Sequence, residues 1–137
     1  MKIQYLPHTA DIRMKITATT LEELFKAGMI GMGHILKEGF CDKNYPIDSK
    51  QEIEIQAMDQ TCLLIDFLSE ILSLCYAEKS IYCKVEFPVL SANELVGTIY
   101  GTHINKLDEE IKAVTYHEAQ VHCNHNNEWE SIVAFDI

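Results

Sequence analysis

The segment from Asp59 to Cys75 constrains the fold of this 137-residue chain more than any other. Its apolar residues recur at helical spacing and form one broad face: Leu63, Leu64, Phe67, Leu68, Ile71, Leu72 and Cys75. Asp59 stands just before them, where a carboxylate can accept hydrogen bonds from the free N–H groups that begin a helix. This is the clearest helix in the chain, and we expect its apolar face to pack on a sheet.

A second helix is predicted after residue 20. Thr20 and Glu23 form a capping box, and a helical apolar stripe follows as far as Leu36. Residues 28–33 contain three glycines in the pattern Gly-x-x-Gly-x-Gly. They lie inside the helical pattern and do not directly follow a strand, so they are not a nucleotide-binding loop. Glycines inside a helix favour close packing or a weak helix end.

The remaining segments read mainly as strands. Alternation of apolar and polar residues predicts strands over residues 12–18 and 53–57, and residues 39–50 form a turn-rich connection. Further alternating or apolar stretches lie near 81–89, 94–101, 111–117, 119–123 and 129–136. Strand–helix units followed by a run of strands indicate an α+β fold. We therefore expect a single domain over residues 1–137, with two main helices packed on one face of a mixed or antiparallel sheet.

Charge argues against direct binding of nucleic acid. The net charge is −10, from 21 acidic and 11 basic residues. Binding to phosphates relies on lysine and arginine, so a basic protein partner or a bound cation suits this chain better than RNA. The apolar runs are only a few residues long and no basic, apolar leader opens the chain, so we expect no membrane span, no signal peptide and a cytoplasmic protein.

The cysteines give no sign of a metal site. They stand at positions 41, 62, 75, 83 and 123, and no two of them form a Cys-x-x-Cys pair. Cys62, Cys75 and Cys83 fall on the apolar phases of their segments, as small buried residues do. In a cytosolic protein we expect all five to be reduced and structural.

Two aspartates stand at the ends of predicted strands. Asp11 begins the strand that leads into the first helix, and Asp136 ends the last strand. If these strands are antiparallel neighbours, the two carboxylates and the carboxylate of Ile137 converge at one edge of the sheet. Clustered anions need a cation, and hard oxygen ligands suit Ca²⁺ or Mg²⁺. The alternative is that Asp11 caps a turn and Asp136 is a solvated end residue.

Five short motifs extend across the chain and resemble those of the archease family. They are HTADI (8–12), TLEELF (20–25), LLIDFL (63–68), IKAVTYH (111–117) and FDI (135–137). The resemblance implies a non-catalytic accessory protein that activates the GTP-dependent RNA ligase of the RtcB type, by promoting ligase guanylylation and multiple turnover. It places the chain in tRNA splicing or RNA repair. The alternative that it leaves open is a chaperone or specificity partner of a tRNA cytosine-5 methyltransferase.

The resemblance also implies a site. Asp11, Asp136 and the carboxylate of Ile137 would hold a divalent cation, most naturally Ca²⁺, with Mg²⁺ or Mn²⁺ as alternatives. Lys112, His117 and His8 are candidate contacts around it, either to the ligands or to the partner. The sequence contains no Walker loop and no Gly-x-Ser-x-Gly motif, which agrees with a protein that is not an enzyme.

Overall fold

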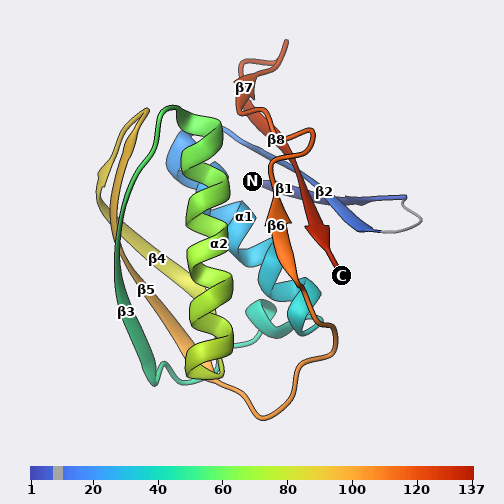
Figure 1. Cartoon of the computed structure of the whole chain (residues 1–137), viewed down its shortest axis with the longest axis vertical. Helices are drawn as coiled ribbons and strands as arrows, with labels where there is room; N and C mark the ends of the chain where they lie inside the picture. Colours follow the sequence, from blue (N-terminus) through green and yellow to red (C-terminus); the bar gives the residue numbers. More distant parts are fainter. Residues whose placement is uncertain (8–10) are drawn as a thin grey trace.

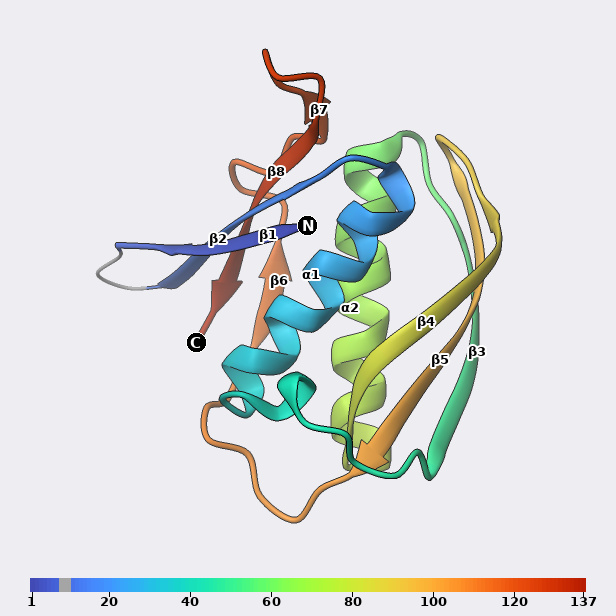
Figure 2. The same ribbon diagram turned by 180° about the vertical axis from the view of Figure 1, so that it is seen from behind.

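The two helices lie between two antiparallel sheets (Figures 1 and 2). The structure is a computed structural model that describes residues 1–7 and 11–137. The elements in chain order are β1 (Lys2–Leu6), β2 (Asp11–Ala18), α1 (Leu21–Leu36), the 3₁₀ helix η1 (Phe40–Asp42), β3 (Ser49–Gln56), α2 (Gln60–Glu78), β4 (Ser80–Leu90), β5 (Glu94–His103), β6 (Ala113–Thr115), β7 (His122–Cys123) and β8 (Trp129–Asp136).

The larger sheet has the strand order β1-β2-β8-β6, with β7 also paired to β8, and the smaller sheet has the order β3-β5-β4. Every pairing is antiparallel. The predicted α+β fold with two helices packed against antiparallel strands is therefore confirmed. The strands divide between two sheets where one was expected, and both helices contact both sheets.

Helix α2 has apolar side chains on more than one side, and burying all of them requires the second sheet. Leu63, Leu64 and Ile65 are consecutive and all fully buried. Since successive residues in a helix point about 100° apart, these three side chains cover roughly 200° of the surface. A single sheet could not bury them all, and the second sheet and α1 cover the remainder.

The start of each helix is fixed by the predicted cap. The Thr20 hydroxyl accepts a hydrogen bond from the Glu23 N–H (3.1 Å), and the Asp59 carboxylate accepts one from the Cys62 N–H (2.8 Å).

Among the described residues, α2 is the one helix long and apolar enough to cross a membrane, with a mean hydropathy of 1.3. In that window, 44% of the residues are buried inside this fold, so packing between the sheets accounts for much of the apolar composition.

The glycines of α1 mark close packing, and the helix continues through all of them to Leu36. A Cβ atom at Gly31 would overlap the sulfur of Met14 on β2 and touch Ile3 on β1. A Cβ atom at Gly28 would come within 3.3 Å of Leu68 on α2. The absence of a side chain at Gly31 therefore lets α1 lie close to the larger sheet.

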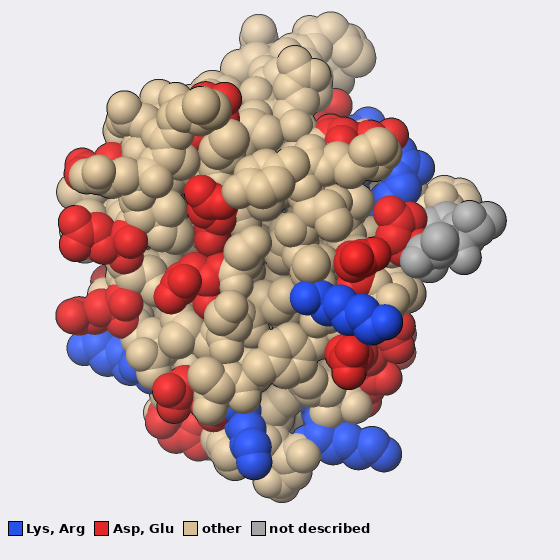
Figure 3. All heavy atoms as spheres, viewed as in Figure 1, with Lys and Arg blue, Asp and Glu red and all other residues tan. Residues whose placement is uncertain are grey.

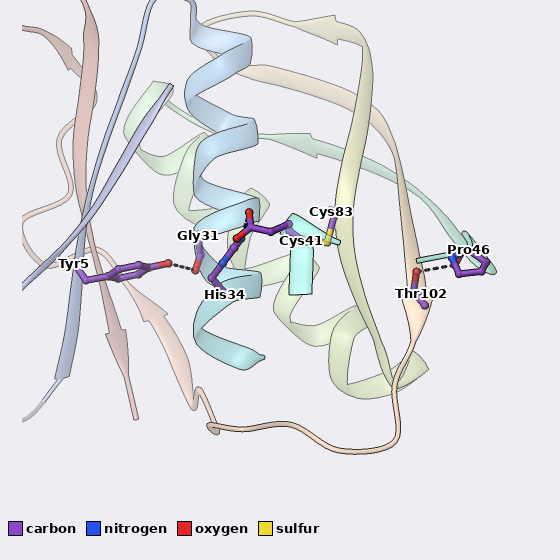
Figure 4. Close-up of a disulfide and its surroundings, with 8 residues drawn as sticks. Tyr5, Gly31, His34, Cys41, Pro46, Cys83 and Thr102 are labelled. Carbon is purple, nitrogen blue, oxygen red and sulfur yellow. Dashed lines mark hydrogen bonds and ion pairs between the residues drawn. A yellow bond between two sulfur atoms is a disulfide. The ribbon is translucent and has the colours of Figure 1, made fainter. Parts of the chain in front are cut away.

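The expectation that all five cysteines are reduced is wrong for Cys41 and Cys83. They form a disulfide with a Cα–Cα distance of 5.5 Å (Figure 4). It links η1, which follows α1, to β4 of the smaller sheet. The partners are 42 residues apart, so only the tertiary fold brings them together. Cys62, Cys75 and Cys123 are free thiols.

Candidate functional site: a carboxylate edge on the larger sheet

The N-terminal end of β2 lies beside the C-terminal end of β8. The register pairs Asp11 directly with Asp136, and on the other side of β8 it pairs Asp136 with Ala113 of β6. The antiparallel arrangement on which the predicted site depended is therefore present. Figure 1 shows the end of β8, marked C, between β2 and β6.

Directly opposite residues of an antiparallel pair project from the same face of the sheet. For Asp11 and Asp136 this is the outer face, because the neighbouring residues Ile12 and Phe135 pack on the core side. Asp11 is half-buried and Asp136 is exposed. Like charges directly opposite one another destabilise a sheet, so this pair is unfavourable unless a cation lies between them.

The two basic residues that follow Asp11 on the same face of β2 pair with other acidic residues. Arg13 Nε lies 2.7 Å from Glu118 Oε2, in the turn after β6, and Lys15 Nζ lies 3.6 Å from Glu130 Oε1 on β8. Within residues 1–7 and 11–137, neither Asp11 nor Asp136 forms an ion pair. The negative charge of this edge is therefore not neutralised by the described part of the chain.

Two further predicted residues lie at this edge. The backbone N–H of Lys112 donates a hydrogen bond to the Asp136 carbonyl oxygen (2.6 Å), which fixes the segment before β6 against the end of β8. Ile137 is half-buried and packs against the core. Its main chain is thereby held next to Asp136 and close to Lys112.

His117 does not join this group. The strand β6 ends at Thr115, which pairs with Ala134, so His117 lies beyond the end of the strand that is farther from Asp136. It is exposed in the turn that carries Glu118 to Arg13. His8 lies outside the described residues.

The donor set at the edge is made of oxygen atoms. The two aspartate side chains offer hard oxygen donors, which fit Ca²⁺ or Mg²⁺ and do not fit a zinc site of cysteine and histidine. No group of three or more His, Cys, Asp or Glu side chains within the described residues could hold a metal ion. Two side chains alone do not complete the roughly six to eight oxygen ligands of a Ca²⁺ ion, so a cation here would need further oxygen donors from the main chain, water or a partner.

Sequence reasoning missed Glu118 as a residue that shapes this edge. The alternation of β2 puts the positively charged Arg13 on the same face as Asp11, two residues away. Nothing in the local pattern shows that the Arg13 side chain pairs with Glu118, which lies 105 residues later in the chain. The ion pair matters here because it withdraws Arg13 from the aspartates.

Fold and edge together define a class of protein. It is a small α+β protein with two helices between antiparallel sheets and a pair of opposed carboxylates at one sheet edge. The model described as "Archease protein family (MTH1598/TM1083)" matches residues 4–137. The chain belongs to the archease protein family.

Similar proteins come from archaea and from an animal. The chain is 29% identical to Protein archease of Methanosarcina barkeri, over 98% of this chain and 94% of that protein. It is 31% identical to Protein archease-like of Drosophila melanogaster, over 88% of this chain and 80% of that protein. The resemblance seen in the sequence motifs is confirmed.

Two solved structures share the fold. The solution structure of Methanobacterium thermoautotrophicum protein 1598 has a TM-score of 0.78 and 23% identity, and covers 98% of both chains. A crystal structure from Thermotoga maritima, described as an archease and possible chaperone, has a TM-score of 0.60 and 22% identity. It covers 100% of this chain and 98% of that chain. At these identities the two structures support the fold alone.

Proposed function

We propose that this protein is a non-catalytic accessory protein that activates a GTP-dependent RtcB-type RNA ligase in tRNA splicing or RNA repair. It promotes the step in which a ligase histidine takes up GMP from GTP with release of pyrophosphate, and so restores ligase for further turnovers. The observation that carries the proposal is the direct pairing of Asp11 with Asp136 in a chain of the archease family.

The edge acts with a divalent cation, most naturally Ca²⁺, or with Mg²⁺ or Mn²⁺. Asp11, Asp136 and the terminal carboxylate of Ile137 hold it, and the cation supplies the positive charge that these anions lack. Lys112 lies beside Asp136 and adds a further positive charge for an anionic group of the partner. His117 lies beyond the end of β6 that is farther from Asp136, which favours a role in partner contact over one in binding the cation.

The partner in this proposal is a protein and not RNA. The net charge is −10, and Figure 3 shows acidic side chains spread over the face it draws, with fewer basic ones among them. Such a surface repels a phosphate backbone and attracts a basic protein surface. The proposed location is the cytoplasm, where the ligase and its RNA would meet.

The test is the formation of the ligase–GMP adduct from GTP and metal with no RNA present. Adding this protein should accelerate adduct formation, and Asp136→Asn should remove most of the acceleration. That substitution removes the charge but keeps the main-chain carbonyl that accepts the Lys112 N–H. The matched control is Glu54→Gln, which removes one exposed negative charge from β3 of the other sheet.

An unchanged rate of adduct formation, together with tight binding to tRNA alone, would overturn the proposal.

A second candidate function is a chaperone role, in which the partner is a tRNA cytosine-5 methyltransferase. The Thermotoga maritima protein of the same fold is described as a possible chaperone. Protection of the methyltransferase from aggregation, with no effect on the ligase, would favour this second candidate.

A further inference from the structure

An open hollow of about 470 Å³ lies where the hairpin of β1 and β2 approaches the C-terminal end of α1. Its size falls within the roughly 300–1,000 Å³ range of ligand pockets. The lining residues are Tyr5, Ile12, His34, Ile35, Glu38, Asp108 and Glu109. The segment after β5 closes one side, because the N–H of Asp108 donates a hydrogen bond to the Leu36 carbonyl (2.8 Å).

An aromatic ring held in place forms one wall. The Tyr5 hydroxyl donates a hydrogen bond to the Gly31 carbonyl (2.8 Å), which links β1 to α1 (Figure 4). The side chain is nevertheless 48% exposed. Burial raises the pKa of Tyr5 to about 12, so the ring carries no charge near neutral pH. Ile12 and Ile35 make the rest of the wall apolar.

The rim is negative. The carboxylates of Glu38 and Glu109 are exposed, and neither forms an ion pair within the described residues. Asp108 accepts a hydrogen bond from the Glu38 N–H and lies 3.8 Å from Lys37 Nζ, which also donates to the Lys106 carbonyl. The C-terminal end of α1 adds the negative end of the helix dipole.

We infer that this hollow receives an arginine side chain of a protein partner. The apolar wall suits the alkyl stem, the fixed Tyr5 ring offers a face for a guanidinium group, and Glu38 and Glu109 supply its counter-charges. Arginine fits better than lysine, because its planar and weakly hydrated head stacks on aromatic rings. Ile12 follows Asp11 in β2 but projects from the opposite face, so the hollow lies near the same end of β2 as the carboxylate edge and on the other face of the sheet. The inference concerns the chemistry of the partner and does not depend on the ligase.

The test is an amide NMR titration with N-acetylarginine amide. The neutral isostere N-acetylcitrulline amide serves as the control, because it keeps the shape and removes the charge. We expect saturable shifts in residues that line the hollow with the arginine probe alone. The double variant Glu38→Gln/Glu109→Gln should weaken binding by about fivefold, the size expected from the loss of two exposed charge pairs.

A matched double variant checks that the weaker binding of the arginine probe is specific to charges lost at this hollow. Glu52→Gln/Glu54→Gln removes the same charge from exposed positions on β3 and should leave binding unchanged. Tyr5→Leu should weaken binding even though it changes no charge, and circular dichroism checks that the variant folds. Equal shifts with the citrulline probe, equal weakening in both double variants, or no saturable shifts would each overturn the inference. None of these results bears on ligase activation, which is measured separately.

Discussion

Replacing Asp136 with asparagine should change the stability of this protein in opposite directions with and without Ca²⁺. Without a cation, the substitution removes the repulsion between Asp136 and the directly opposed Asp11. Carboxylates about 5 Å apart in a water-like medium repel by roughly 0.8 kcal/mol, and opposed like charges in sheets cost a similar amount. The variant should therefore be more stable than the native protein by roughly 0.5–1 kcal/mol in a chelator.

With the cation the order should reverse. A ligand at about 100 times its Kd stabilises the folded state by about 2.7 kcal/mol. For a chain of this length, 1 kcal/mol shifts the melting temperature by about 3–5 °C. The native protein should therefore gain about 10 °C from Ca²⁺, whereas the variant, which has lost one of two side-chain ligands, should gain little.

The assay is thermal unfolding followed by circular dichroism at fixed ionic strength, first in chelator and then across a Ca²⁺ titration. The control is Glu54→Gln on β3, for which the order of melting temperatures should not reverse. If Asp136→Asn lowers stability in chelator, the two aspartates do not repel each other as argued. If Ca²⁺ stabilises both proteins equally, the cation binds elsewhere.

Three further predictions concern the fold. Cys41→Ala/Cys83→Ala opens a link between residues 42 apart and should lower the free energy of unfolding by up to about 4 kcal/mol, measured by urea denaturation. Gly31→Ala should cost about 1–3 kcal/mol in the same assay, because the new methyl group overlaps Met14. Burial raises the pKa of Tyr5 to about 12, so its contribution to stability is intact below pH about 10 and declines as the pH rises toward 12. Tyr5→Phe should make this decline in stability shallower without abolishing it, because the pKa values of Tyr76, Tyr82 and Tyr116 are raised as well.

Both helices could be predicted from the sequence because their signals are local. The apolar spacing of each helix and the caps at Thr20 and Asp59 depend on residues within a few turns of one another. The strand β1 was not predicted, because Lys2–Leu6 is short and only Ile3 and Leu6 are even half-buried. It forms because β2 offers a neighbouring strand to pair with.

The second sheet and the disulfide depend on tertiary contacts that no local pattern contains. The β5–β6 connection carries the chain from the smaller sheet to the larger one. The pair Cys41 and Cys83 meets only because η1 lies against β4. The expected cytosolic location argued for reduced thiols, but the tertiary fold brings Cys41 and Cys83 together and they form a disulfide.

The candidate site differs from both cases. The sequence predicted that Asp11 and Asp136 would meet, but not which basic residues would pair with them. Strand ends placed Asp11 and Asp136 together on condition that β2 and β8 are antiparallel neighbours, and they are. Whether the pair needs a cation is a separate question, because Arg13 projects from the same face and could have neutralised it. Glu118 binds Arg13 at 2.7 Å and so leaves the aspartates without a counter-ion from the described chain. The lack of an ion-pair partner for Asp11 and Asp136 within the described residues is therefore a product of the tertiary structure, and it is the feature that most favours a bound cation at this edge.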